Sequence, residues 1–308
     1  MMKTILLTGG AGFIGSHIAE TYLHAGYRVV VVDNLASGKR ENIPPEAAFY
    51  EADITDKQAM EEIFGKERPR IVNHQAAHIN LRRSVEDPLF DARCNIMGSI
   101  VLIDLSIRAN VERFIFASTG GAMYGEPARL PVSEDTSPNP LSPYGVAKRS
   151  VELYLECYRQ THGLSSVILR YGNVYGPRQD TEGEAGVVAI FSKKILIGET
   201  CTIYGDGTQT RDYVYVEDVS QANLLALEGP PGIYNIGTGI ETSVLELVHL
   251  LRETSSHKVK ANHSPPRAGE VARITLSCKH AEKHLHWKAQ VGLQEGITRT
   301  FRWFAERR

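Results

Sequence analysis

The 308-residue sequence has few cysteines and no long hydrophobic run. The four cysteines are scattered, and no two of them form a Cys-x-x-Cys pair; they are Cys94, Cys157, Cys201 and Cys278. This spacing predicts neither a disulfide framework nor a zinc site. No stretch of about 18 consecutive apolar residues occurs, so we expect no transmembrane helix. Buried free thiols in a reducing compartment are the expectation.

The sequence also lacks an excess of positive charge. Lys and Arg number 34 against 36 Asp and Glu, for a net charge of −2. This balance supplies no overall field for nucleic acid or an anionic membrane, so we expect neither as a partner. The N-terminus, MMKTILLTGG, enters an apolar strand and glycines without the pattern of a signal peptide. We therefore expect a cytoplasmic protein.

Short β-branched runs alternate with helix-like stretches through the first half of the chain. The run RVVVVD at 28–33 is typical of a parallel strand that is covered on both faces. The alternation predicts an α/β protein with a doubly wound parallel sheet. The expected strands are residues 4–8, 28–33, 48–53, 70–74, 113–118 and 166–171, and the expected helices are residues 13–25, 56–64, 88–109 and 142–162.

Spaced glycines lie between the first expected strand and the first helix, in TGGAGFIGS. Gly9, Gly12 and Gly15 satisfy G-x-x-G-x-x-G, and Gly10 adds a G-x-G-x-x-G pattern. Glycine there allows a tight turn and lets a pyrophosphate approach the helix N-terminus. A glycine motif alone is weak, but Asp33 follows at the end of the next strand, about 20 residues on. The combination predicts a Rossmann-type dinucleotide-binding domain.

Asp33 also bears on which dinucleotide binds. A carboxylate accepts hydrogen bonds from both ribose hydroxyls and repels a 2′-phosphate, which favours NAD. Lys39 and Arg40 argue for NADP, but they lie farther along the loop. Asp53 ends the third strand and has two interpretations, a contact with the adenine amino group or a solvated acid at a strand end.

The alternation loosens after Tyr171. The segment GNVYGPRQDTEGEAG has the composition of a long functional loop, and Ser243 with Glu246 predicts a capping box at a helix start. We expect residues 1–171 to form the NAD-binding Rossmann domain. Residues 172–308 are expected to form mainly a smaller, interleaved α/β substrate-binding lobe, with part of 212–240 returning to the Rossmann sheet.

The segment SPYGVAKRS supplies a candidate reactive pair. Ser142 suits a helix N-cap and Pro143 the first helical position. Tyr144 and Lys148 then lie at i and i+4 on one face. A neighbouring ammonium stabilises a phenolate and lowers the tyrosine pKa from about 10, so that Tyr144 can exchange a proton with a carbinol. The alternative is an exposed helical pair, because Tyr-x-x-x-Lys is common by chance.

TGGAGFIGS, DNLASG, STGGAMYG, YGVAK and LRYGNVYGPRQ together resemble the motifs of extended short-chain dehydrogenases/reductases. Most closely they resemble the UDP-glucose (UDP-galactose) 4-epimerase family, from Thr4 to about Trp287. The resemblance implies an NAD-dependent isomerase. In it, Thr119 hydrogen-bonds the reacting sugar hydroxyl, Tyr144 is the acid and base, and Lys148 holds the nicotinamide ribose and tunes Tyr144.

The same resemblance implies further binding residues. Those for NAD are Gly9, Gly12, Phe13, Ile14, Gly15, Asp33, Asn34, Ser37, Gly38, Asp53, Ile54, Gln75, Ala76, Ala77, Asn95, Ser118, Tyr144, Lys148 and Tyr171. Those for the UDP-sugar are Thr119, Gly120, Tyr144, Asn173, Arg211, Arg267 and Glu270. Taken singly, an arginine is more often a surface ion pair worth less than about 1 kcal/mol. The matching positions favour phosphate binding for Arg211 and Arg267, and less strongly a ribose contact for Glu270.

Gly120 and Gly121 follow the reactive hydroxyl of Thr119. The resembling 4,6-dehydratases place Asp and Glu there, and related decarboxylases carry a Glu nearby. Glycines supply no proton carrier for elimination, although they also suit a turn with positive φ. The resemblance therefore implies oxidation of the sugar at C4, turning of the 4-keto sugar, and return of the hydride to its opposite face.

The sugar itself stays open between UDP-glucose and UDP-galactose on one side and UDP-N-acetylglucosamine or UDP-glucuronate on the other. The family gates C2 substituents at the position of Ile274, which is neither the large tyrosine nor a small residue. Two other functions are a reductase that releases its cofactor and a non-catalytic NAD sensor. The intact Thr119, Tyr144 and Lys148 argue against the sensor.

Two further patterns concern metals and partners. His280 and His284 lie at i and i+4 with His286 close by, but no His-Glu-x-x-His pattern or cysteine pair accompanies them, so we expect no metal. The helices expected at 88–109 and 142–162 resemble the pair that forms a four-helix dimer interface in the family. We therefore expect a homodimer, with burial inside one chain as the alternative.

Overall fold

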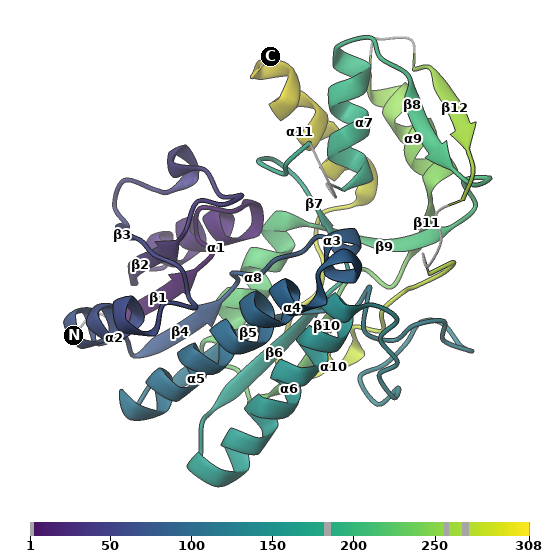
Figure 1. The fold of residues 1–308 in the computed structure, drawn as a ribbon. Coiled ribbons are helices and arrows are strands. Elements are labelled where there is room, and N and C mark those ends of the chain that lie inside the picture. The colour runs from purple at the N-terminus through teal and green to yellow at the C-terminus, as the bar shows by residue number, and fades with distance from the viewer. Residues whose placement is uncertain (1–2, 182–185, 256–258, 267–270, 308) are drawn as a thin grey trace.

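A seven-stranded parallel sheet forms the centre of the computed structural model, which describes residues 3–181, 186–255, 259–266 and 271–307 (Figure 1). The strand order is β10-β6-β5-β4-β1-β2-β3. The chain therefore runs outward from β1 to β3 and restarts on the other side of β1, which creates a switch point between β1 and β4. The strands are β1 (Thr4–Thr8), β2 (Arg28–Asp33), β3 (Ala48–Glu51), β4 (Ile71–His74), β5 (Arg113–Thr119), β6 (Ser166–Tyr171) and β10 (Gly232–Ile236).

Helices cover both faces of this sheet, as the alternating sequence predicted (Figure 1). Because neighbouring side chains of a strand point to opposite faces, Ile5 and Leu7 of β1 belong to one core and Leu6 to the other. The first core also receives apolar residues of α1 (Phe13–His24), α8 (Val216–Ala226) and α10 (Lys279–His284). The second receives those of α2 (Lys57–Glu67), α5 (Gly98–Arg108) and α6 (Pro143–His162). The doubly wound architecture is confirmed.

The helix expected over residues 88–109 is present as a continuous helical stretch, but a π-helical turn interrupts its α-helical pattern. The structure has α4 (Pro88–Ala92), a π-helical turn η2 (Arg93–Met97) and then α5, with a short α3 (Leu81–Glu86) before them. The Asp87 side chain accepts a hydrogen bond from the Phe90 backbone and caps α4, while Pro88 suits its first position. The π turn arises where Asn95 binds the chain after β4, a contact that no local pattern shows.

A smaller lobe forms around a separate core. Its sheets have the orders β11-β9-β7 and β12-β8. The strands are β7 (Asn173–Tyr175), β8 (Cys201–Tyr204), β9 (Thr210–Tyr215), β11 (Glu241–Ser243) and β12 (Ala261–Ser264), and the helices are α7 (Val187–Leu196), α9 (Val244–Thr254) and α11 (Leu293–Glu306). The predicted capping box of Ser243 and Glu246 is present at α9. Outside this lobe, in the loop after β2 of the large sheet, the chain forms a 3-10 turn, η1 (Arg40–Asn42).

The two lobes interleave along the chain, because β10 and α8 return to the large sheet between segments of the small lobe. β7 continues directly from β6 and carries the chain out of the large sheet (Figure 1). The carboxyl ends of the parallel strands therefore face the small lobe, which is where a ligand binds in sheets of this kind. Within the described parts of the chain, none of the helices combines the length and the apolar character needed to cross a membrane.

Candidate active site

The glycine loop between β1 and α1 is tightly constrained. Gly9 has a φ of +71°, and a Cβ there would lie 2.6 Å from the backbone nitrogen of Ala76. A Cβ on Gly15 would overlap the carbonyl oxygen of Gly9. The helix begins at Phe13, and no described side chain caps it or places an acid in its first turn. Its free N–H groups and positive dipole end therefore suit a pyrophosphate.

Asp33 lies buried at the end of β2, beside this loop. One carboxylate oxygen accepts a hydrogen bond from the Ala11 backbone at 3.0 Å, and the other from Leu35 at 2.9 Å. Each oxygen keeps a lone pair for a ribose hydroxyl. Arg40, one of the two residues that argued for NADP, holds its guanidinium 4.3 Å from the ring centroid of Phe49. The arrangement fits NAD rather than NADP.

Asp53 organises the loops after β2 and β3. Its carboxylate accepts a 2.7 Å hydrogen bond from the Asn34 amide and two from Thr55, at 2.7 and 2.8 Å. Burial acts to raise the pKa of Asp53, but the hydrogen bonds from Thr55 and Asn34 lower it overall. Nearby, a Cβ on Gly38 would lie 2.9 Å from the Asp33 carboxylate. The adenine contact of Asp53 stays a prediction.

A buried amide chain lies beneath the opposite end of the site. The Tyr171 hydroxyl accepts a hydrogen bond from the Asn223 amide at 2.8 Å, and the Gln75 amide donates to Asn73 at 2.6 Å. Asn73 donates in turn to Asn223 at 2.9 Å. Burial raises the pKa of Tyr171 to about 12, so this phenol stays neutral and serves as a fixed hydrogen-bonding group.

Helix α6 carries the predicted reactive pair. The Ser142 hydroxyl accepts a 3.1 Å hydrogen bond from the Gly145 backbone and caps the helix, as predicted. The Lys148 ammonium lies 5.9 Å from the ring centroid of Tyr144 and donates to the carbonyl of Ala117 at 2.8 Å. Lys148 is buried while Tyr144 is partly exposed. The exposed-pair alternative is therefore wrong.

The pKa values of Tyr144 and Lys148 depend on burial and on nearby carboxylates. Burial raises the pKa of Tyr144, and the Asp91 carboxylate raises it further. Burial also lowers the pKa of Lys148 to about 8, against Asp91 and Glu152, which raise it. Burial thus dominates the pKa of Tyr144 in the structure, and the lowering of that pKa by Lys148 stays a prediction.

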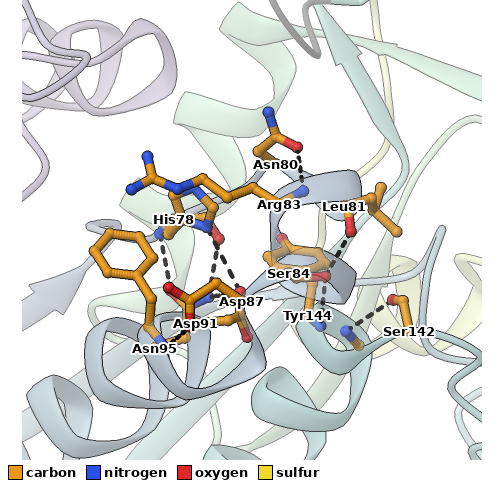
Figure 2. A network of polar contacts seen from close by, with 12 residues as sticks. His78, Asn80, Leu81, Arg83, Ser84, Asp87, Asp91, Asn95, Ser142 and Tyr144 are labelled. Atoms are coloured by element: carbon orange, nitrogen blue, oxygen red, sulfur yellow. Dashed lines mark hydrogen bonds and ion pairs between the residues drawn. The ribbon is translucent and has the colours of Figure 1, made fainter.

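Asp91 belongs to a polar cluster beside Tyr144, which Figure 2 shows. The Asn95 amide donates to Asp91 at 2.9 Å and to the His78 carbonyl at 2.8 Å, while its oxygen accepts the His78 backbone N–H at 2.8 Å. The His78 Nδ1 lies 3.6 Å from Asp91 and has no hydrogen-bond partner among the described residues. The hydroxyl of Ser84 in α3 contacts the reactive helix, accepting a hydrogen bond from the Tyr144 backbone at 3.4 Å.

Thr119 ends β5 directly opposite Tyr171 in the register of β6. Its hydroxyl accepts a 3.1 Å hydrogen bond from the Ala122 backbone. A Cβ on Gly121 would lie 4.0 Å from this hydroxyl and 3.6 Å from the Asn173 side chain. A Cβ on Gly120 would instead lie 2.5 Å from a methyl group of Leu276. Position 121 thus borders the reactive hydroxyl, and glycine keeps the space beside it open.

The family model of the NAD dependent epimerase/dehydratase family matches residues 5–237. The chain belongs to this family. A putative UDP-glucose 4-epimerase of Methanocaldococcus jannaschii is 48% identical, and 97% of each chain is covered. The UDP-glucose 4-epimerase of Thermotoga maritima, solved with UDP-glucose, is similar at 49% identity and a TM-score of 0.97 over 99% of both chains. That of Thermus thermophilus, solved with NAD, is similar at 46% identity and 0.94 over 98% of both chains.

In this epimerase/dehydratase fold, the predicted substrate residues are placed unevenly. Asn173 begins β7 beside Gly121, whereas Arg211 lies on β9 and donates to the carbonyls of Thr210 and Ala272, at 2.8 and 3.4 Å. Arg267 and Glu270 lie outside the described residues. Lys148 lies 5.9 Å from the Tyr144 ring and bonds to Ala117 of β5, the strand that ends at Thr119. The roles of these residues and the phosphate contacts stay predictions.

The sequence motifs did not identify several residues that support this epimerase/dehydratase site. Asp91 and Asn223 are buried and His78 is partly buried, and each has polar partners from other elements. Asn223 is one of several polar residues of α8, so the sequence gives no local signal that singles it out. The Ser118 hydroxyl, predicted to contact the cofactor, donates to the Glu152 carboxylate at 2.6 Å.

Among the residues that the structure describes, no group of three or more His, Cys, Asp or Glu side chains is arranged to hold a metal ion. His280 stacks on Tyr234 with ring centroids 4.8 Å apart, and its Nδ1 meets the Ile233 carbonyl at 3.0 Å. His284 lies edge-on to His280 at 4.7 Å. These histidines pack against β10, as side chains of the fold.

Proposed function

We propose that this chain interconverts UDP-glucose and UDP-galactose by reversible, NAD-mediated oxidation at C4 of the sugar. The observation that supports the proposal is that Lys148, 5.9 Å from the Tyr144 ring, bonds to β5, which ends at Thr119 and is followed by glycine at 120 and 121. The site thereby offers one phenol for proton transfer and no acid beside Thr119 for elimination. The named relatives of similar length and sequence support the same activity.

NAD fits the residues present. The backbone of the first turn of α1 would hold the pyrophosphate, Asp33 the adenosine ribose, and Lys148 the nicotinamide ribose. When bound, NAD would accept a hydride from C4 of the sugar and return it to the same carbon. The loop Gln75–Ala77 and the amide chain around Tyr171 would form the floor of this site.

The residues of the chain handle the proton. Tyr144 accepts the proton of the C4 hydroxyl as the hydride leaves C4, which converts the alcohol into a ketone. Thr119 donates a hydrogen bond to the sugar oxygen and fixes it near the phenol. Because burial and Asp91 raise the pKa of Tyr144, the phenolate needs the positive charge of Lys148 close by. The reverse transfers on the opposite face of the sugar restore all groups, so nothing is consumed.

The turning of the sugar requires unequal binding. The space beside Gly121, bordered by Thr119 and Asn173, leaves the sugar room to rotate about its phosphate linkage. The nucleotide must meanwhile stay fixed, and we assign that task to Asn173, Arg211, Arg267 and Glu270. Bidentate arginine donors suit a diphosphate. A tightly fitted sugar would bind one epimer and slow the rotation.

The deciding experiment uses the purified chain with UDP-galactose and no added cofactor. We expect UDP-glucose to appear by chromatography, without NADH in the medium. Conversion of UDP-N-acetylglucosamine or UDP-glucuronate but not UDP-galactose would favour the alternative substrates. Ile274, at the position implied to gate the C2 substituent, is buried against Met123 and Tyr124. Stoichiometric NADH release would instead indicate a reductase.

The Tyr144→Phe variant tests the proposed proton carrier. General acid–base groups contribute about 10²- to 10⁴-fold to rate, so we expect kcat to fall by at least about 100-fold. NAD should still copurify, because the ring and Lys148 remain. The measurement is initial-rate kinetics with a parallel assay of bound NAD. Near-normal turnover would contradict the role of Tyr144.

We also infer a cytoplasmic homodimer. Exposed apolar side chains gather on α3, η2, α4 and α6, where Val85, Leu89, Met97, Val146 and Leu153 are about half to three-quarters exposed. Patches of this kind commonly mark interaction surfaces. The four cysteines, all described, are free thiols, which suits a reducing compartment.

A further inference from the structure

A buried carboxylate lies one helical turn beyond the reactive lysine. Glu152 of α6 is 1% exposed. One of its oxygens accepts hydrogen bonds from the Ser118 hydroxyl at 2.6 Å and the Arg170 Nε at 2.8 Å. The other accepts from Arg170 Nη2 at 2.6 Å and Arg149 Nη1 at 3.0 Å. The carboxylate is thus fully engaged by neighbouring donors.

The partners of Glu152 are the immediate neighbours of site residues. Ser118 precedes Thr119 on β5, and Arg170 precedes Tyr171 on β6. In the register of the sheet Ser118 pairs with Arg170 and Thr119 with Tyr171. One side chain of the reactive helix therefore holds together the ends of β5 and β6, the two strands that carry Thr119 and Tyr171.

The same network extends into the loop after Thr119. Arg170 Nη1 donates to the Tyr124 hydroxyl at 2.8 Å, and that hydroxyl donates to the Asn235 side chain at 2.9 Å. Tyr124 closes the segment that begins at Ser118 and contains the two glycines. Through Tyr124, the loop after Thr119 is thereby bonded to Arg170 of β6, which Glu152 binds, and to Asn235 of β10.

Stability alone is a weak reason for such a group. Removing a carboxylate and a guanidinium from water costs several kcal/mol per ion, and apolar replacements of buried pairs are often neutral or stabilising. The chain has an exposed counterpart on the same helix, Glu156 with Arg159, whose two hydrogen bonds measure 2.8 and 2.9 Å. The bidentate geometry is similar, but only Glu152 touches elements of the site.

We propose that Glu152 is a positioning residue for the epimerisation, which sets Thr119 against Tyr144. The proposal rests on the proposed function. It assigns no contact between Glu152 and the substrate. The hydrogen bonds of Glu152 hold the end of β5, which carries the Thr119 hydroxyl, at a fixed distance from α6, which carries the Tyr144 phenol. In an active site, misplacement of a group by about 1 Å can lower the rate by up to about 100-fold.

The charged neighbours of Lys148 act on its pKa, and Glu152 is one of them. Asp91 on α4 and Glu152 on α6 both act to raise its pKa, which burial lowers to about 8. His74 on β4 also faces this region, but burial lowers its pKa to about 3, so it adds no positive charge at neutral pH. The Tyr144 ring on α6 is the remaining titratable neighbour, at 5.9 Å. Glu152 is therefore one of two carboxylates that favour the ammonium.

The test compares three variants with the wild type by kcat, KM for UDP-galactose, the pH profile of kcat and thermal midpoint. Glu152→Gln keeps the volume and an acceptor for Ser118 but removes the charge. Glu152→Leu combined with Arg170→Met replaces the ion pair by apolar groups and keeps the helix packed. Glu156→Gln is the matched control, because it breaks the exposed ion pair on the same helix.

For Glu152→Gln we expect kcat to fall at least about tenfold, while KM stays within about twofold of the wild type. The alkaline limb of the kcat–pH profile should move to lower pH, because Lys148 loses a carboxylate that raises its pKa. The double variant should keep a thermal midpoint near the wild type and still show the loss in kcat. Glu156→Gln should match the wild type.

Two results overturn the positioning role: wild-type kcat and pH profile in Glu152→Gln, or wild-type kcat in the folded double variant. If the double variant does not fold, the Gln variant decides. A wild type that converts no UDP-sugar would refute the proposed function itself, which is a different outcome from an active wild type with equally active variants.

Discussion

At the scale of single residues, Asp91 contributes, after burial, to the pKa values of the two reactive side chains. Its carboxylate raises the pKa of both Tyr144 and Lys148. In Asp91→Asn both pKa values fall, so the phenolate forms at lower pH and the ammonium is also lost at lower pH. We expect both limbs of the kcat–pH profile to move down, each by about one unit or less.

The matched control is Asp104→Asn, which removes an exposed carboxylate paired with Arg108 on α5. Its profile should overlay that of the wild type. A profile for Asp91→Asn that shifts in opposite directions at its two limbs, or does not shift, would contradict the electrostatic role. Buffers of constant ionic strength are needed, since salt screens charges near the surface.

Residue patterns predicted the reactive pair but not its electrostatics. Tyr144 and Lys148 were recognisable because a helix places i and i+4 on one face behind a Ser-Pro start. The direction of the Tyr144 pKa depends instead on burial and on Asp91, which lies on another helix. Glu152 was missed for the same reason, because a buried carboxylate is identified by donors that are distant in sequence.

At the scale of elements, the glycine loop and the first helix act as one rigid unit. In Gly15→Ala the new Cβ would overlap the Gly9 carbonyl, so the loop has to move. We expect the purified variant to lose most of its bound NAD, measured by absorbance after denaturation. Gly65→Ala is the control: Gly65 lies in α2 with nothing within 4 Å of a new Cβ.

In that control the exchange should leave bound NAD unchanged. It should also raise the free energy of unfolding by up to about 1 kcal/mol, because alanine favours an exposed helix interior over glycine. If Gly15→Ala retained NAD as well as Gly65→Ala does, the loop would not be the pyrophosphate cradle. Denaturant unfolding of both variants separates a local loss of binding from a general loss of stability.

Element boundaries followed the sequence where local chemistry decides them. The bounds of β1, β2 and β6 match the predicted strands at 4–8, 28–33 and 166–171, since buried parallel strands are continuous apolar runs. The helix expected over 88–109 contains a π turn where Asn95 binds the chain of His78, and α3 was not predicted. Tertiary contacts decide both differences.

At the scale of the whole molecule, the alternation of strands and helices predicted the parallel sheet. It did not predict the order of the strands, which places the switch point between β1 and β4. The switch point between β1 and β4 brings the glycine loop and the Gln75 segment to the same edge as Thr119 and Tyr144. Which strands are neighbours depends on long-range packing, so sequence patterns alone predicted the class of the fold but not this order.

The last prediction concerns assembly. Leu89 is 77% exposed on α4, and exposed Val85 and Leu153 lie on α3 and α6, which pack against each other and α4. A second copy that covers these side chains removes apolar surface from water, so we expect a mass near twice 34.1 kDa by light scattering. Leu89→Glu should give monomers, while Ile197→Glu, on the small lobe, should not. A wild type that stays monomeric at high concentration would contradict the dimer and assign the patch to another partner.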